Sequence, residues 1–76
     1  MLPSSLSQDA RILYTVLPEN GSAEGNIYLR NQFGWEEEYY EKLRDELESA
    51  GLIVRGRGRG GSIARALPPK GTKENT

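Results

Sequence analysis

The sequence contains no cysteine and no histidine. Without cysteine there is no disulfide scaffold and no catalytic thiol. Without either residue there is no zinc site of the Cys/His kind and no imidazole for acid–base catalysis. No apolar run approaches the roughly 18 residues of a membrane span, and no charged-then-apolar signal peptide opens the chain. These absences predict a small, cytoplasmic domain that acts by binding. Paired carboxylates among residues 36–48 are the remaining candidates for hydrolysis or for holding magnesium, but they lie on one helix with no second element to supply converging polar groups. We therefore expect no catalysis, metal, cofactor, membrane contact or small-molecule substrate.

Strong charge of one sign is also missing from the chain as a whole. Ten Lys plus Arg stand against eleven Asp plus Glu in 76 residues, a formal net charge of -1. A chain of this length predicts one small module, and a neutral module argues at first against nucleic-acid binding. The charges are, however, unevenly distributed. Residues 36–48 hold seven acids and two bases, a net of -5, whereas residues 52–67 hold four arginines and no acid.

The spacing of apolar residues predicts three helices. The first begins near Ser5 or Ser7, either of which can cap it, and ends before Pro18. Its expected buried stripe is Leu6, Ala10, Leu13 and Leu17. The second helix runs from about Glu24 or Asn26 to Phe33, and Gly34 ends it. The third begins at Trp35 and ends near Ala50, with Gly51 as its C-terminal cap.

A β-hairpin is expected after the helices. Residues 52–54 are rich in β-branched side chains and predict one strand, residues 55–61 a flexible tip, and residues 62–67 the returning strand. Three helices followed by a hairpin, with a tight junction at Phe33-Gly34-Trp35, predict an α+β winged helix-turn-helix domain. A three-helix bundle with a disordered Gly-Arg tail is the alternative. We expect a flexible lead-in over residues 1–6, the domain over 7–67, and a disordered tail or linker over 68–76.

The Arg/Gly segment is the sharpest functional feature of the sequence. Arg55, Arg57 and Arg59 alternate with glycines, which allow the backbone to approach another surface closely. A guanidinium suits bidentate phosphate contacts and narrow, electronegative minor grooves. We therefore expect these three arginines, together with Arg65, to contact nucleic acid. The alternative is that this segment is a solvated loop whose arginines only keep the hairpin soluble.

The third helix supplies weaker candidates. Its bases Lys42 and Arg44, and one of the adjacent Tyr39 and Tyr40, are expected near the DNA major groove, and Asn31 of the second helix is a further polar candidate. Neighbouring helical residues lie about 100° apart, so one tyrosine is expected to be buried and the other to face outward. The seven acids are poorly suited to face phosphates. Three of them, Glu36 to Glu38, complement the positive end of the helix dipole instead.

Four groups of residues carry a family resemblance: Gly25-Asn26, Phe33-Gly34-Trp35-Glu36, Leu43-Arg44-Asp45-Glu46-Leu47, and Ala50-Gly51-Leu52 followed by Arg55-Gly56-Arg57-Gly58-Arg59-Gly60-Gly61-Ser62. Residues 21–67 resemble small winged helix domains of bacterial restriction–modification and phage-defence proteins, which often stand beside DNA methyltransferase domains. The resemblance implies a DNA-binding module that serves a larger enzyme. No methyltransferase or nuclease motif is present, so it implies no catalysis by this chain.

The functional expectation is therefore duplex DNA binding by a cytoplasmic, nucleoid-associated module, with a larger enzyme, a partner subunit or a second copy as a further partner. The rival is a protein-interaction winged helix in which the acidic third helix docks on a basic surface. RNA or single-stranded binding is a third reading, although few aromatic side chains are expected to face outward for base stacking.

Overall fold

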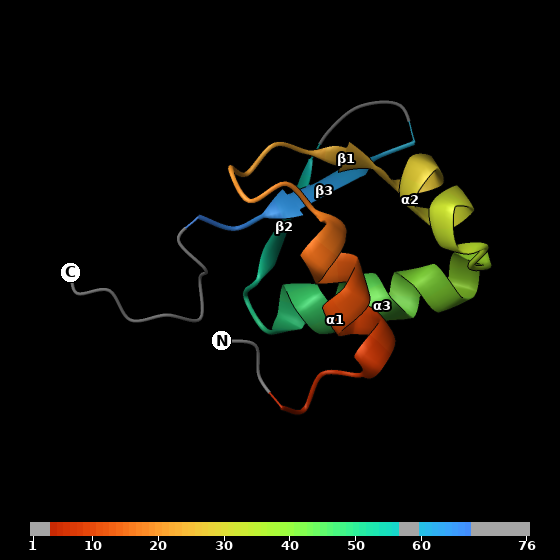
Figure 1. The fold of residues 1–76 in the computed structure, drawn as a ribbon, viewed down its shortest axis with the longest axis horizontal. Helices are drawn as coiled ribbons and strands as arrows, with labels where there is room; N and C mark the ends of the chain where they lie inside the picture. The colour runs from red at the N-terminus through yellow and green to blue at the C-terminus, as the bar shows by residue number, and fades with distance from the viewer. Residues whose placement is uncertain (1–3, 57–59, 68–76) are drawn as a thin grey trace.

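A computed structural model describes residues 4–56 and 60–67 of the chain. In chain order its elements are α1 (Gln8–Val16), β1 (Glu24–Gly25), α2 (Asn26–Phe33), α3 (Glu37–Ser49), β2 (Ile53–Gly56) and β3 (Ser62–Arg65). Helix α1 crosses α3, and the small sheet lies beside them, with α2 leading from the sheet to the start of α3 (Figure 1).

The start and the buried stripe of α1 agree with the sequence. Ser7 is the N-cap, and its hydroxyl accepts a hydrogen bond of 3.2 Å from the backbone of Ala10. All four residues of the expected stripe are buried: Leu6, Ala10, Leu13 and Leu17. Leu6 therefore belongs to the core, although it lies inside the segment expected as a lead-in. Residues 1–3 of that segment and the expected tail, 68–76, lie outside the described residues.

The junction between α2 and α3 turns on Gly34, which has a left-handed φ of 70°. Helix α3 begins at Glu37, two residues later than expected, with Glu36 as its N-cap. The reason is that Trp35 completes the C-terminal cap of α2: its backbone N–H donates to the carbonyl of Arg30 at 3.1 Å, and its ring stacks on Phe33. This is the short connection that a helix-turn-helix requires.

Replacing Gly34 by alanine tests this junction. A Cβ at Gly34 meets nothing within 4 Å, so the cost comes from the positive φ alone. We expect the free energy of unfolding to fall by about 1–2 kcal/mol, measured by urea denaturation. Gly25→Ala is the matched control: its site is equally open, but its φ is -70°, so we expect a change within about 0.5 kcal/mol. Equal effects of the two substitutions would contradict this explanation.

Helix α3 ends in the glycine cap that the sequence predicts. Gly51 has a φ of 75°, and its N–H donates to the carbonyl of Glu48 at 2.9 Å. The N–H of Leu52 reaches back to the carbonyl of Leu47 at 3.0 Å, which completes a Schellman motif. Because Leu52 is used in this cap, β2 begins one residue later than expected.

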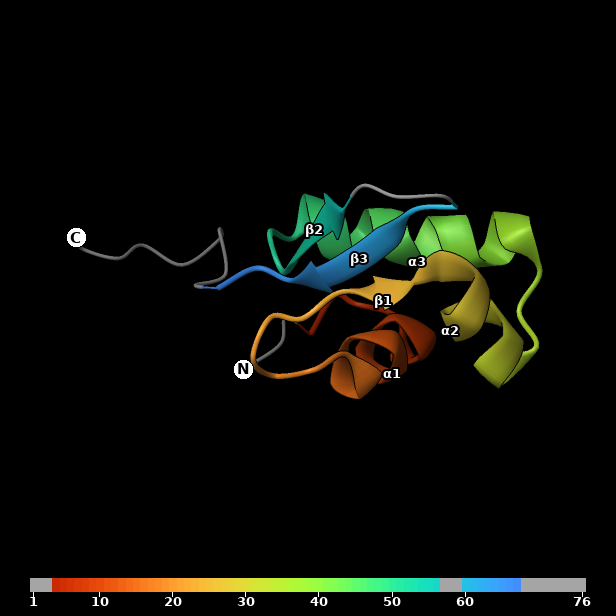
Figure 2. The same cartoon turned by 90° about the horizontal axis from the view of Figure 1, so that it is seen from above.

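The sheet contains one strand, β1, that the sequence pattern does not predict. Its order is β1-β3-β2 and both pairings are antiparallel, with Gly25 opposite Ser62 and Val54 opposite Ala64. Figure 2 shows β3 between its two neighbours. β1 has only two residues, Glu24 and Gly25, too few to show an alternating pattern and of types that are depleted in strands. Its pairing depends on tertiary contact with β3.

The core joins all three helices to the sheet. Its largest fully buried side chains are Tyr40, Leu13, Leu17, Leu29, Leu43, Leu47, Ile53 and Ile63. The protein is thus a small α+β domain with three helices followed by an antiparallel hairpin, a topology consistent with a winged helix. Within residues 4–56 and 60–67, no helix has the length and apolar character to cross a membrane.

Candidate nucleic-acid interface

Arg55, the first arginine of the expected wing, is paired with α3. Its Nη2 lies 2.9 Å from Oδ1 of Asp45, and its Nε lies 2.8 Å from Oε1 of Glu48. The three side chains are all substantially exposed, so these ion pairs contribute little to stability. They do neutralise two of the acids of α3, and they hold the base of the hairpin against that helix.

The next two candidates, Arg57 and Arg59, lie outside the described residues. The structure does describe the residues on either side of them. Gly56 ends β2, and Gly60 and Gly61 precede β3 with φ values of 79° each. The side-chain amide of Asn26 donates to the carbonyl of Gly60 at 3.2 Å, and the backbone N–H of Asn26 donates to that of Gly61 at 3.1 Å. Gly60 and Gly61 are therefore held beside the N-terminus of α2.

Arg65 is engaged within the fold. Its Nη2 donates to the carbonyls of Tyr14 and Thr15 at 3.1 and 3.2 Å, and its guanidinium lies 4.2 Å from the centroid of the Tyr14 ring. A cation at the C-terminal end of α1 complements the helix dipole and satisfies carbonyls that the helix leaves unpaired. The structure thus gives Arg65 a structural task, away from the hairpin tip.

Arg65→Ala should act on stability rather than on DNA affinity. Loss of two charge-assisted hydrogen bonds and a cation–π contact predicts a decrease of about 2 kcal/mol in the free energy of unfolding. Arg65→Lys keeps the charge but not the planar fork, so about half of that loss is expected. Urea denaturation measures both values. In conditions where each variant is fully folded, we expect DNA affinity within about twofold of the unchanged protein, since this guanidinium is held at the end of α1 and not at the proposed DNA contacts. A tenfold loss would contradict this assignment.

The outward face of α3 is acidic. Glu37, Glu38, Asp45 and Glu48 are exposed, as is Lys42, and no ion pair joins Lys42 to another described residue. Asn31 of α2 is exposed as well. Lys42 and Asn31 are therefore accessible, but the carboxylates around Lys42 oppose close approach of phosphates.

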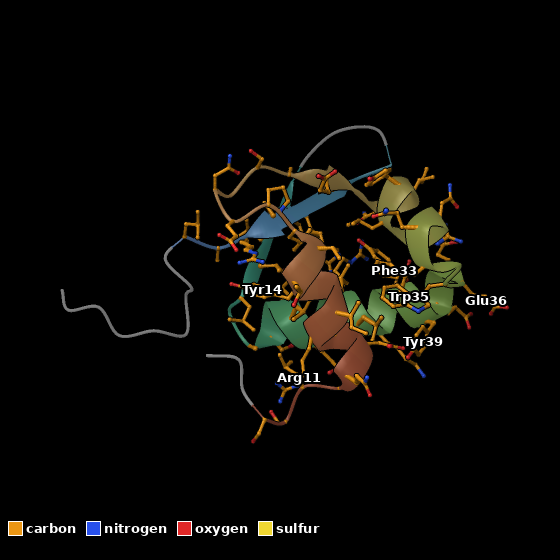
Figure 3. The ribbon with its side chains drawn as sticks, viewed as in Figure 1. Arg11, Tyr14, Phe33, Trp35, Glu36 and Tyr39 are labelled. Atoms are coloured by element: carbon orange, nitrogen blue, oxygen red, sulfur yellow. The ribbon has the colours of Figure 1, made fainter. Side chains whose placement is uncertain are left out.

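One of the two adjacent tyrosines is buried and the other is exposed, as expected. Tyr40 is buried at 1% exposure and donates its hydroxyl proton to the side-chain carbonyl of Asn26. Tyr39 is 42% exposed and donates to Asp9 of α1, a bond that raises its pKa above the ordinary value. Figure 3 shows Tyr39 with Phe33 and Trp35 at the end of the molecule where α2 turns into α3.

A groove of about 330 Å³ lies between α2, α3 and the start of β3. Its lining residues come from three places in the sequence: Asn26, Ile27 and Arg30 from α2, Glu37, Tyr40, Glu41 and Arg44 from α3, and Gly60 from the hairpin. The spacings 26, 27, 30 and 37, 40, 41, 44 each describe one helix face. Of the residues predicted to contact DNA, the structure brings two into this groove, Tyr40 and Arg44.

The arginines in and near the groove act on the ionisation of Tyr40. Burial raises the pKa of Tyr40 to about 12, while the positive charges of Arg44, Arg30 and Arg55 oppose that rise. The Tyr40 hydroxyl therefore stays protonated at neutral pH and keeps its bond to Asn26. Arg44 lies over the Tyr40 ring at 5.8 Å from its centroid. Glu37 is exposed and Glu41 is half-buried, so the carboxylates lie nearer the solvent than this hydroxyl.

Two functional candidates in the groove are absent from the sequence-based set: Arg30, and Asn26, which the sequence suggests only as a helix cap. The actual N-cap of α2 is Gly25, which leaves the Asn26 side chain free to join Tyr40 to Gly60. Arg30 lies one helical turn after Asn26, and that spacing on one face is the signal that could have found it. No protein family, curated protein or solved structure matches the chain.

Proposed function

We propose that the chain is a non-catalytic winged helix-turn-helix module that binds duplex DNA chiefly through its Arg/Gly wing. The observation that supports this proposal is how the described residues on either side of the Arg/Gly segment are held. Its two ends are held beside α3 by the Arg55 ion pairs and beside α2 by the two Asn26 hydrogen bonds. Arg57 and Arg59 stand in the sequence between these two ends, and in the proposal they are the arginines of the wing that meet DNA.

The contacts made within the fold limit which arginines are available to DNA. Arg65 donates hydrogen bonds to the end of α1, and Arg55 forms ion pairs with two carboxylates of α3. The proposed contacts are therefore Arg57 and Arg59 of the wing, with Arg44 and Lys42 of α3 as the supporting pair. In this arrangement the wing makes the main DNA contacts. Helix α3 is turned so that most of its carboxylates face away from the phosphates.

Three or four phosphate contacts make a weak binder, because electrostatic affinity grows with the number of phosphates neutralised. Such a module needs a second copy or a tethered domain to hold DNA at physiological salt. The resemblance to winged helix domains of restriction–modification proteins makes a larger DNA-modifying enzyme the partner that we propose. The chain would then position that enzyme on DNA without taking part in its chemistry.

An NMR titration with mixed-sequence duplex DNA at low salt tests this function. We expect the amides of residues 55–61 to shift first and those of α3 to shift less. Amides of α1 near Tyr14 and Thr15 are the internal control and should stay still. If the wing and α3 signals do not move at millimolar DNA, the proposed function is wrong.

The exposed acids of α3 favour a second candidate, docking of this helix on a basic protein surface. Glu38 is suited to test it, since it is exposed and does not line the groove. If this candidate holds, a lysine-rich peptide will shift α3 amides more than wing amides, and Glu38→Gln will weaken that response while DNA affinity changes little. Under the leading proposal, the same peptide leaves both regions unmoved.

A further inference from the structure

The groove between α2, α3 and the hairpin contains guanidinium donors that the fold does not use. Arg44 makes no hydrogen bond or ion pair with any residue that the structure describes, and its Nε is buried without an acceptor. A buried donor without an acceptor carries a desolvation cost, so such groups in native proteins usually meet a water, ion or ligand. Arg44 thus indicates that the groove receives an acceptor from outside.

Arg65 is the second arginine with a buried, unpaired Nε, but its surroundings differ from those of Arg44. Its Nη2 already bonds two carbonyls and its plane stacks on Tyr14. That guanidinium is bonded to the end of α1 and does not line the groove. Arg44 has only the Tyr40 ring beneath it and faces an open volume of about 330 Å³.

Arg30 places a second guanidinium on the same groove. Its Nε donates to the carbonyl of Trp35 at 3.4 Å, and its Nη atoms have no acceptor among the described residues. The Asn26 amide is different: its hydrogen bonds to Tyr40 and Gly60 hold it in place, so it shapes the groove rather than serving a ligand. Two guanidiniums with free donors, one on each helix, form a pair suited to an oxyanion.

The two glutamates decide which oxyanion is favoured. Glu37 and Glu41 line the groove together with the arginines, so its formal charge is zero. A phosphate monoester or free phosphate carries about -1.5 to -2 at neutral pH, whereas a phosphodiester carries a single charge. Carboxylates near the groove opening therefore penalise the more highly charged ligand by like-charge repulsion. A ligand with one negative charge and several acceptor oxygens fits best.

We propose that Arg44 and Arg30 bind one backbone phosphodiester of a nucleic acid in this groove. The inference rests on the proposed DNA-binding function and deepens it, because it places a phosphate between the two helices of the helix-turn-helix instead of on the acidic outer face of α3. The helix approaches DNA with the side that carries Arg44, and the wing holds the neighbouring part of the backbone. The acids on the rim then select for the singly charged diester.

The arginine Nε–H signals of the folded chain in ¹⁵N NMR test this directly. The probes are a short DNA duplex and, separately, inorganic phosphate at the same phosphate concentration. We expect the Arg44 Nε–H signal to shift with the duplex and to respond at least about fivefold less to inorganic phosphate. An equal response to both would overturn the assignment to a diester, and would identify a general phosphate site.

Variants at the groove separate binding from folding. Glu41→Gln removes a rim charge and should raise duplex affinity about two- to fivefold, a gain that loss of folding cannot produce. Glu19→Gln removes the same charge from an exposed loop residue that does not line the groove, and should leave affinity within about 1.5-fold. Arg44→Lys keeps the charge and should lower affinity about five- to tenfold, because the planar fork is lost. Equal gains from the two glutamate changes would overturn the proposal.

The two proposals fail in different ways. If wing amides shift with duplex DNA while the Arg44 signal stays still, the groove proposal is wrong and the proposed function stands. If neither the wing nor Arg44 responds, DNA binding itself is excluded and the groove assignment falls with it. If the Arg44 signal responds to duplex while the wing does not, the phosphate contact stands and the wing-led mode is wrong.

Discussion

Replacing Tyr40 by alanine will remove about 3–5 kcal/mol from the free energy of unfolding, the usual cost of deleting a large buried aromatic side chain. Tyr40 is 1% exposed and belongs to the main hydrophobic core. Its hydroxyl also bonds Asn26, which in turn holds Gly60. Since a single core in a chain of this size rarely supplies more than about 3–5 kcal/mol, the variant should be largely unfolded at physiological temperature.

Urea denaturation followed by far-UV circular dichroism measures this loss. Tyr28→Ala is the matched control, because the same substitution occurs on α2 at a tyrosine that is 55% exposed. Its effect should lie within about 0.5 kcal/mol. Tyr40→Phe keeps the ring and removes only the bond to Asn26, so a loss of about 1 kcal/mol is expected. If Tyr40→Ala costs no more than Tyr28→Ala, the packing described around Tyr40 is wrong.

The second large effect concerns the wing. Changing Arg57 and Arg59 together to glutamine should lower duplex DNA affinity about a hundredfold at low salt, since each charged contact contributes roughly a factor of ten. Urea denaturation of the double variant separates a loss of binding from a loss of folding. Fluorescence anisotropy with a labelled duplex measures the affinity.

Lys70→Gln with Lys73→Gln is the control for net charge. This double change removes the same two positive charges from the segment that follows the domain. We expect it to lower affinity by less than about threefold. A loss as large as that of the arginine pair would mean that overall charge, and not the wing, determines binding.

The local signals in the sequence predict most of the backbone. Gly34 and Gly51 have the positive φ values that helix ends favour, and the apolar stripe of α1 is buried as its spacing predicts. The strand β1 could not be predicted in this way. Two residues, Glu24 and Gly25, carry no periodicity, and only the presence of β3 makes them a strand.

The functional side chains were harder to predict than the fold. Charge and residue type place Arg55 and Arg65 with the other arginines of the hairpin, but the structure engages them with Asp45, Glu48 and the end of α1. Which partner an arginine meets depends on how the helices cross, and spacing within one segment does not contain that information. The same limit applies to Arg30, whose relation to Arg44 exists only once α2 and α3 are packed.

The near-neutral charge of the chain conceals two oppositely charged regions. The acidic region is residues 36–48 and the basic region is residues 52–67, and the ion pairs of Arg55 with Asp45 and Glu48 neutralise part of both. The DNA contacts that we propose are therefore the pair of arginines in the wing and the guanidiniums of the groove. An acidic helix is compatible with DNA binding when the contact surface lies beside its acidic face and not on it.

The salt dependence of duplex binding tests the central claim most directly. Three or four phosphate contacts predict a plot of log K against log salt concentration with a slope of about -3, from roughly -0.9 for each contact. The Arg57, Arg59 double variant should reduce the steepness by about 1.8. Duplex binding with a slope near zero, or no binding at low salt, would contradict an electrostatic DNA-binding module.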